Sequence, residues 1–528
     1  MRKQKRIIAG LLTAAMIVGS ASCGGGRTPG ATNNTADSTT AAGTMPVTTD
    51  PNAALDTNID YDNMAAIEEV DSSNEIGTGP LYEPGKKAGL VKALCYYDIT
   101  GDQPKISEIF AERFGGTVET TICGSLEYFD KLGVLIAAGT APDLVRYDWA
   151  AYPDGVSRNR YTALDEWLDI KSPLWSDLES VIDSFEFKGK HYYFPQNVQP
   201  NFAMIYNKAK IQEANLEDPM DLYFNGQWTW DKWEEMLYTW ASMDKDNIPF
   251  TGGSWSSMMF INTTGTSIIE VTENDIVNNL KSENVSRTMA WLEKLNKEGL
   301  TGKGYVHPGE AFVDGKLLFL AMGFEWGVSS AQETLFKKNI EGEIGAVPFP
   351  RDPQADKYYL AADTLGYMVP NGAQNVQGAV QFILSSRIYE TDPEVIKERR
   401  DILMNQNPTY YAKCPECKFN CEEAGYADSP TCPECNAQRK EKFHVIYTPE
   451  QFQIYDDMIN PEKFGLVFDC TVGFSQDFQN LFVNSEETIL DGPLYAKEQV
   501  VTFTSMLETN YNVIETTLDE YRAILNQE

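Results

Sequence analysis

Apolar and polar residues follow two different periods along the chain, which predicts a mixture of helices and strands. Residues 124–152 show both periods. Phe129, Leu132 and Ile136 recur at helical spacing, and the Gly-Thr-Ala-Pro-Asp sequence that follows predicts the end of that helix. The short apolar run at residues 144–147 is typical of a buried strand.

Two further helices are predicted by the same spacing. Thr229 is a suitable N-cap for a helix that begins after it, and Asp231 favours the positive end of the helix dipole. A terminal helix is predicted over residues 500–528. The expected packing residues are Trp233, Met236, Leu237 and Trp240 in the first helix and Met506, Tyr511, Val513 and Ile514 in the second.

Between residues 86 and 528, strand-like and helix-like segments alternate, as they do in βα units. This alternation predicts an α/β protein with doubly wound sheets. In such a fold, ligands bind beyond the carboxyl ends of the strands. The strand predicted at residues 144–147 ends in Tyr147, Asp148 and Trp149. We therefore expect these residues to form the rim of a binding cleft rather than a catalytic centre.

Five sequence motifs occur in the order that is typical of one family of binding proteins. They are the strand-loop-helix pattern of residues 90–116, AAGTAPDLV at 137–145, NFAMIYNKAKI at 201–211, FVDGKLLFLAMGFEWG at 312–327 and IGAVPFP at 344–350. Together they resemble the extracellular solute-binding proteins of ABC importers, in the sugar-binding group that includes maltose-binding protein. The resemblance covers residues 90–370 and fades beyond them.

The resemblance implies a periplasmic-binding-protein-like fold of type II, in which two hinged α/β lobes enclose a ligand cleft. Each lobe is then discontinuous. Residues 86–198 with 351–400 form lobe 1, and residues 199–350 with 401–528 form lobe 2. Closure around a ligand removes water and produces a change of shape that a membrane partner can read. The implied function is capture of a carbohydrate, expected to be an oligosaccharide, and its delivery to the permease subunits of an ABC importer.

A sugar ring has apolar C–H faces and a rim of hydroxyls, so its site needs aromatic rings for stacking and carboxylates for hydrogen bonds. The chain contains 10 Trp and 26 Tyr, which supply such rings. The resemblance places Trp326 at a stacking position of lobe 2, and Trp255 at another aromatic contact of that lobe. The full set of candidate ligand-binding residues is Trp326, Trp255, Tyr147, Asp148, Trp149, Asp98, Asp102 and Asp363.

The N-terminal segment predicts export and attachment to a membrane. Four basic residues precede an apolar run, residues 7–18, that is too short to span a bilayer, so residues 1–22 are predicted to be a signal peptide. The sequence that ends at Cys23 resembles a bacterial lipobox, although Ser20 replaces its usual leucine. It implies a lipid on Cys23, with plain cleavage nearby as the alternative. Residues 23–58 are predicted to be a flexible tether on the outer face of the bacterial cell membrane.

The charge of the chain argues against nucleic acid as a partner. The sequence has 43 basic and 77 acidic residues, a formal net charge of −34. Removal of the signal peptide takes away four basic residues and raises the negative charge to −38. A field of this sign repels nucleic acid and anionic membrane faces. It fits a neutral ligand better than an anionic one.

Residues 414–435 contain two Cys-Pro-Glu-Cys sequences separated by fourteen residues. Two such pairs place four thiolates tetrahedrally around zinc, in the closed arrangement of a structural site. The insert resembles a zinc ribbon or a rubredoxin-like loop. Disulfides and iron are the alternatives, because exported proteins form disulfides and iron accepts the same ligands. The predicted ligands are Cys414, Cys417, Cys432 and Cys435, with Cys421 and His444 as spare candidates.

Two other classes of function compete with that of an importer's binding protein. A secreted glycoside hydrolase needs only two carboxylates, which the many acidic residues would supply. However, the chain has only three histidines and neither an HExxH nor a GxSxG sequence, so we predict no catalytic residue and no enzyme activity. A surface interaction protein would use the cysteine insert for docking. We expect a monomer in either case.

Overall fold

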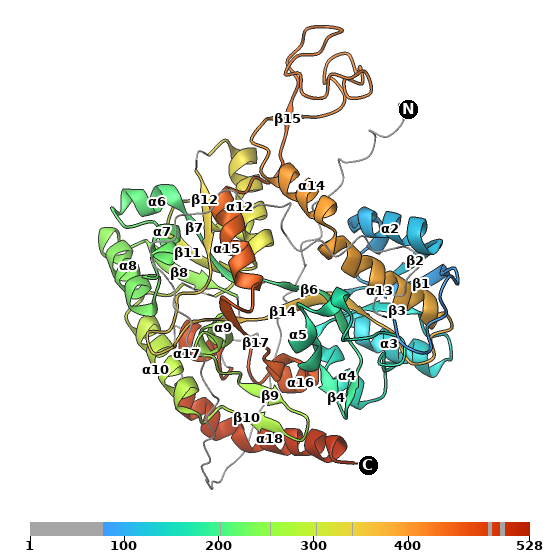
Figure 1. Ribbon diagram of the computed structural model, residues 1–528. Coiled ribbons are helices and arrows are strands. Elements are labelled where there is room, and N and C mark those ends of the chain that lie inside the picture. Colours follow the sequence, from blue (N-terminus) through green and yellow to red (C-terminus); the bar gives the residue numbers. More distant parts are fainter. Residues whose placement is uncertain are drawn as a thin grey trace.

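The computed structural model describes residues 78–200, 202–253, 255–302, 304–340, 342–483, 488–496 and 502–527 (Figure 1). The predicted signal peptide, Cys23 and the tether lie outside these residues. Within the described part of the chain, no helix combines the length and the apolar character needed to cross a membrane. The chain folds into two α/β lobes with a small cysteine-rich insert, which confirms the predicted fold class.

Lobe 1 is built on a five-stranded mixed sheet. Its strands are β1 (Gly89–Cys95), β2 (Gly116–Ile122), β3 (Leu144–Arg146), β6 (Phe194–Gln199) and β14 (Asp363–Met368). The order across the sheet is β2-β1-β3-β14-β6. β1 is parallel to β2 and β3, whereas β14 runs antiparallel to β3 and β6. A strand from late in the chain thus lies inside the sheet of the first lobe.

The helices of lobe 1 cover both faces of this sheet. They are α1 (Ile99–Asp102), α2 (Pro104–Phe114), α3 (Tyr128–Ala137), α4 (Asp154–Ser157), α5 (Glu179–Asp183), α13 (Val376–Thr391) and α14 (Pro393–Leu403). α2 starts with a proline and ends at Gly115, whose φ of 61° is left-handed. Its Phe110 ring meets Phe382 of α13 edge-on, with centroids 5.2 Å apart. α3 and β3 are the helix and strand predicted within residues 124–152.

Lobe 2 is built on a four-stranded sheet of order β12-β7-β11-β8. These strands are β7 (Ala203–Asn207), β8 (Ile248–Gly252), β11 (Leu317–Met322) and β12 (Ile344–Val347). β8 and β11 are parallel, and β7 runs antiparallel to its two neighbours. Every residue of β7, β11 and β12 is buried, as expected for strands covered on both faces.

The helices of lobe 2 confirm the predicted core spacing. They are α6 (Lys208–Glu213), α7 (Pro219–Phe224), α8 (Trp230–Met243), α9 (Ser256–Asn262), α10 (Glu283–Lys297), α11 (Pro308–Ala311) and α12 (Phe324–Lys338). α8 begins at the predicted N-cap, where the side chain of Thr229 accepts a hydrogen bond from the amide of Lys232. All four of its predicted packing residues are buried.

The chain crosses between the lobes in three places. Three residues separate β6 of lobe 1 from β7 of lobe 2, and the return path runs from β12 through β13 (Tyr358–Ala361) to β14. β13 pairs in parallel with β17 (Phe464–Val467), which places the end of β17 beside the start of β14. The third crossing leads from α14 to α15 (Pro449–Ile459) and contains the cysteine insert, which extends away from both lobes (Figure 1).

The predicted terminal helix is α18 (Phe503–Leu525). It contacts α10 of lobe 2 and α4 of lobe 1. Ile514 is buried, and Met506 and Tyr511 are half-buried, in agreement with their predicted packing role. The prediction for Val513 is wrong, because this side chain is 55% exposed. Neighbouring residues on a helix point about 100° apart, so Ile514 faces the body and Val513 faces away.

Candidate ligand-binding site

Two predicted ligand-binding tryptophans, one from each lobe, lie face to face. Trp149 follows β3 of lobe 1 and begins the short helix η2 (Trp149–Ala151). Trp255 follows β8 of lobe 2 and stands at the N-cap position of α9. The two indole rings are nearly parallel, with 14° between their planes and 6.4 Å between their centroids. The segments that follow strands of the two lobes therefore meet at this point.

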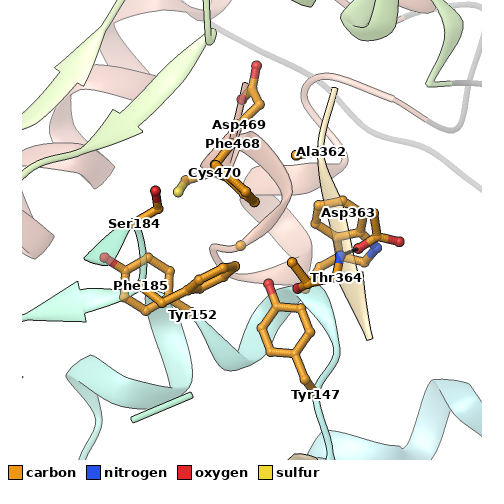
Figure 2. Close-up of a pocket in the computed structure, with 12 residues that line it drawn as sticks. Tyr147, Tyr152, Ser184, Phe185, Ala362, Asp363, Thr364, Phe468, Asp469 and Cys470 are labelled. Carbon is orange, nitrogen blue, oxygen red and sulfur yellow. Dashed lines mark hydrogen bonds between the residues drawn. The ribbon is translucent and has the colours of Figure 1, made fainter. Parts of the chain in front are cut away.

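A small cavity lies beside Trp149 (Figure 2). Its side chains come from the segment after β3, from the two residues after α5, from the start of β14 with the residue before it, and from the segment after β17. Its volume of about 20 Å³ suffices for one water molecule but not for a sugar ring. The lobes are thus closed here. The lining residues are Tyr147, Trp149, Tyr152, Ser184, Phe185, Ala362, Asp363, Thr364, Phe468, Asp469, Cys470 and Gly473.

Two more predicted residues, Tyr147 and Asp363, line this cavity. The Tyr147 ring stacks on that of Tyr193, with centroids 4.2 Å apart. Burial raises the pKa of Tyr147, so its phenol stays neutral and is able both to donate and to accept a hydrogen bond. Asp363 is the first residue of β14, and its carboxylate accepts a hydrogen bond of 2.8 Å from the amide of Thr364. Both polar groups are nearly buried.

Asp148 directly precedes Trp149 and is oriented by a buried arginine. One carboxylate oxygen accepts a 2.7 Å hydrogen bond from the amide of Trp149, and the other lies 3.8 Å from Arg146. Arg146 also bonds to the hydroxyl of Tyr96 and, over 3.2 Å, to the carbonyl of Tyr147. Its Nε is buried without a hydrogen-bond partner among the described residues. Arg146 is not among the predicted ligand-binding residues, although it directly precedes Tyr147.

Asp98, Asp102 and Trp326 do not line the cavity, and neither do Asp148 and Trp255. Asp98 caps α1, where its carboxylate accepts hydrogen bonds from the amide and the hydroxyl of Thr100. Asp102 ends α1, and its side chain lies outside what the structure describes. Trp326 lies in the first turn of α12, half-buried, with its ring edge-on to His307 at 5.6 Å.

Phe468, Asp469 and Cys470 also line the cavity, although they are not among the predicted ligand-binding residues. These residues follow the apolar strand β17. The same signal, an apolar run followed by polar and aromatic residues, led to the prediction of Tyr147, Asp148 and Trp149. The carboxylate of Asp469 is fully engaged within the protein. It accepts hydrogen bonds from the amide of Ile268 at 2.6 Å, the Asn262 side chain at 3.0 Å and the amide of Thr471 at 3.0 Å. Asp469 thus joins the end of β17 to α9.

The four predicted cysteine ligands form one group, with all sulfur atoms within 4.8 Å of one another. The sulfurs of Cys414 and Cys435 are 3.6 Å apart, as are those of Cys417 and Cys432. None of the described cysteines forms a disulfide. The two Cys-Pro-Glu-Cys loops have the same backbone conformation. In each loop, the residue after the second cysteine has a positive φ, and its amide donates a hydrogen bond to the carbonyl oxygen of the first cysteine. These residues are Lys418 and Asn436. Such a group is able to hold a metal ion.

The spare candidates lie outside this group. Cys421 is buried in the insert, and its sulfur is 3.8 Å from the carbonyl oxygen of Phe419. His444 lies at the base of the insert, where one ring nitrogen is 2.8 Å from the carbonyl oxygen of Asn405 and the other is 3.2 Å from the hydroxyl of Thr409. The described structure therefore gathers the four paired cysteines alone.

Two α/β lobes with aromatic and carboxylate groups between them are typical of a protein that binds a small ligand in a cleft. Residues 105–394, more than half of the chain, match the model of the bacterial extracellular solute-binding proteins. The chain belongs to this family. The predicted resemblance is confirmed, and the chain is a solute-binding protein rather than an enzyme.

Solved structures with the same fold have little sequence identity with the chain. An ABC substrate-binding protein, Lmo0181 from Listeria monocytogenes, has a TM-score of 0.54 at 14% identity and covers 82% of this chain and 99% of its own. The galacto-N-biose/lacto-N-biose I-binding protein of Bifidobacterium longum has a TM-score of 0.53 at 13% identity and covers 83% of this chain and 99% of its own. The GacH receptor of Streptomyces glaucescens has a TM-score of 0.52 at 15% identity and covers 83% of this chain and 99% of its own. No curated protein matches the chain in sequence.

Proposed function

We propose that this protein captures a carbohydrate between its lobes and delivers it to the permease subunits of an ABC importer. One observation carries the proposal: Trp149 and Trp255 come from different lobes, and their rings lie almost parallel at 6.4 Å. Facing indoles present flat apolar surfaces that suit the C–H faces of a sugar ring. Tyr147, Asp148 and Asp363, on the same side of lobe 1, supply hydroxyl and carboxylate groups for the hydroxyls of the sugar.

Ligand entry requires the lobes to separate at the two indoles. A sugar ring that contacts both rings at about 3.5–4 Å needs indole planes about 7–8 Å apart. The present centroid separation of 6.4 Å is shorter than this. We assign residues 86–198 with 351–400 to one moving lobe and residues 199–350 with 401–528 to the other. The crossings between them then act as the hinge.

The ligands bound in the similar structures support a carbohydrate ligand. The Listeria protein is in complex with cycloalternan, the Bifidobacterium protein with lacto-N-biose and the Streptomyces receptor with acarbose. The negative charge of this chain also favours a neutral ligand over an anionic one. The ligands of the similar structures and the negative charge thus agree with the two parallel indoles, whose flat faces suit a sugar ring.

Calorimetric titration with a broad glycan panel that includes cycloalternan, lacto-N-biose and acarbose tests the proposal. We expect at least one glycan to bind, to raise the melting temperature and to change the tryptophan fluorescence. Trp149→Ala and Trp255→Ala should each weaken that binding about tenfold, because each removes one stacked ring. Trp167→Ala is the matched control, since Trp167 is half-buried and belongs neither to the pair of stacked indoles nor to the cavity lining. Lack of binding across the panel, or equal affinity in all three variants, would contradict the proposal.

We also propose that the protein is exported and is held at the outer face of the cell membrane by a lipid on Cys23. Membership of an extracellular family supports export. The proposed tether, residues 23–58, leaves the lobes free to move above the membrane. Metabolic labelling with an alkyne analogue of palmitate should mark the protein, and Cys23→Ala should lose the label and release the protein into the medium. Retention of the label in that variant would place the lipid elsewhere.

We further propose that the four cysteines bind a structural zinc ion. Tetrahedral zinc with bonds of about 2.3 Å holds its sulfurs about 3.8 Å apart. The two sulfur pairs at 3.6 Å fit this spacing, whereas a disulfide needs about 2.05 Å. Four protein ligands fill the coordination sphere and leave no open position for catalysis. Elemental analysis should find equimolar zinc. Equimolar iron, or two disulfides without metal, would contradict this assignment.

A further inference from the structure

The C-terminal helix α18 reaches from lobe 2 to lobe 1. Figure 1 shows it along the lower edge of the molecule, where it passes from α10 and β10 (Ile276–Asn278) to α4. Hydrogen bonds at its start, middle and end attach it to lobe 2. They join Phe503 to Glu293 at 2.6 Å, Glu515 to Asn278 at 2.7 Å and Arg522 to the carbonyl of Ile276 at 2.8 Å. Lobe 2 therefore holds the helix along its whole length.

The contact of α18 with lobe 1 is centred on Tyr521. Its hydroxyl donates a hydrogen bond to the carboxylate of Asp154 in α4, and both side chains are buried. Arg158 donates to the same carboxylate oxygen at 2.7 Å, which fixes the orientation of Asp154. Burial, and then the bond to Asp154, raises the pKa of Tyr521 to about 12, so the phenol keeps the proton that it donates. The two lobes are thus joined here by a directed polar contact.

A second stretch of the C-terminal region bonds to the same residue. The amide of Asp154 donates a hydrogen bond of 3.1 Å to the carbonyl of Gly473, which follows η4 (Cys470–Val472). A β-carbon on Gly473 would lie 2.0 Å from the carbonyl oxygen of Tyr152, so only glycine permits this close approach. The ring of the next residue, Phe474, meets Tyr521 edge-on with 4.9 Å between centroids. Two parts of residues 401–528 therefore converge on Asp154.

Asp154 belongs to the same short segment of lobe 1 as Trp149. Only Tyr152 and Pro153 separate η2, which begins with Trp149, from α4, which begins with Asp154. Separation of the two indoles therefore moves Asp154 away from lobe 2 as well. A hydrogen bond acts over no more than about 3.2 Å between its heavy atoms. Both bonds to Asp154 must then break when the lobes part, and their loss opposes opening.

We propose that α18 is a latch that holds the lobes closed in the absence of ligand, through the bond from Tyr521 to Asp154. The bond from Asp154 to Gly473 supports the same closed form. This inference rests on the two moving lobes of the proposed function, but not on the chemistry of the ligand. Ligand entry requires release of the latch. Weakening the latch must then increase the open population while each lobe stays folded.

Hydrogen–deuterium exchange, followed by mass spectrometry on the protein without added glycan, tests the latch. Tyr521→Phe keeps the ring and its contact with Phe474 but removes the bond to Asp154. Amide exchange within residues 149–158 should become about tenfold faster, because the closed form loses one hydrogen bond to a charged group. Exchange in β1 and β11 should stay unchanged, since each lobe remains folded. Small-angle X-ray scattering should give a larger radius of gyration for the variant than for wild type.

Tyr511→Phe is the matched control on the same helix. The ring of Tyr511 lies over Lys281 of lobe 2, with 3.3 Å from the ammonium nitrogen to the ring centroid, so loss of its hydroxyl should change neither measurement. Three results would overturn the inference: unchanged exchange within residues 149–158, equal acceleration in β1 and β11, or faster exchange with an unchanged radius of gyration. Each would do so even if glycans bind as proposed. A working latch in a protein that binds no glycan would overturn the carbohydrate proposal alone.

Discussion

The cleft and the cysteine insert are both predicted as binding sites, but the fold assembles them in opposite ways. The insert brings its four cysteines together from residues 414–435, through two loops of identical sequence. The cleft gathers Trp149 of lobe 1, Trp255 of lobe 2 and the segment from Phe468 to Cys470, which the pairing of β17 with β13 brings near. Spacing along the chain therefore defines the first site, whereas topology defines the second.

The two sites also depend on different parts of the molecule for their stability. Cys414, Cys421 and Cys432 form a buried cluster that is separate from the main core. The insert's ends are held together at its base, where the amide of Tyr447 donates to the carbonyl of Leu403 at 3.0 Å. Gln332 of α12 bonds to both backbone groups of Ile446, which fixes this base to lobe 2. We therefore expect the insert to lose its structure without disturbing the cleft.

Loss of the metal is expected to have the largest effect, and only within the insert. The double variant Cys414→Ser with Cys432→Ser removes one sulfur from each loop, so bound metal should fall below detection and proteases should cleave the insert rapidly. Glycan affinity should change by less than about twofold, since the sites share no residues. Elemental analysis, limited proteolysis and calorimetry measure these outcomes, with Cys421→Ser as the control that keeps the metal. A parallel loss of glycan affinity would show that the two sites are coupled.

Removal of the Asp469 carboxylate is expected to destabilise the body of the protein. Asp469→Ala leaves buried donors of Ile268 and Asn262 without their acceptor, which should cost about 3 kcal/mol in the free energy of unfolding. Glycan affinity should fall as well, because Asp469 links the cavity to α9, whose first residue follows Trp255. Urea unfolding measures the loss. Asp477→Ala, at an exposed position of the same C-terminal segment, should stay within about 0.5 kcal/mol of wild type. Equal stability of the two variants would refute this role.

The smallest effect is expected for the N-cap of α8, which the local sequence predicts. Thr229→Ala removes the N-cap of α8 and should cost about 1 kcal/mol in the free energy of unfolding, with glycan affinity unchanged. Thr239→Ala, in the middle of the same helix, should cost nothing, because alanine has the higher helix propensity. Chemical unfolding compares the two variants. A change in glycan affinity with Thr229→Ala would mean that this cap also positions the cleft.

Local patterns predicted the elements that present the site. The apolar spacing of residues 124–152 gave α3 and β3, and the residues after β3 include Tyr147 and Trp149, which line the cavity. Trp255 was identified through resemblance to a family, because a tryptophan in a polar loop has no local signal that separates a ligand contact from ordinary packing. Its place opposite Trp149 follows from how the two lobes are joined.

Strand pairing brings to the cavity the residues that local sequence patterns could not place there. Nothing in the local pattern of residues 464–467 indicates that they pair with β13, so Phe468 and Asp469 could not be placed at the cavity. Residue types that bind ligands also serve as helix caps, and the sequence alone does not separate the two roles. Asp98 follows a strand, as a ligand-binding carboxylate would, yet its oxygen already accepts two hydrogen bonds from Thr100 as a helix cap. Its role in ligand binding stays a prediction.

The central claim is that a carbohydrate lies between indoles contributed by the two lobes. A crystal structure of the protein with the glycan that binds most tightly in calorimetry tests this most directly. We expect a sugar ring between Trp149 and Trp255, with the indole planes about 7–8 Å apart. A glycan bound elsewhere, with the two indoles still in their present contact, would contradict it.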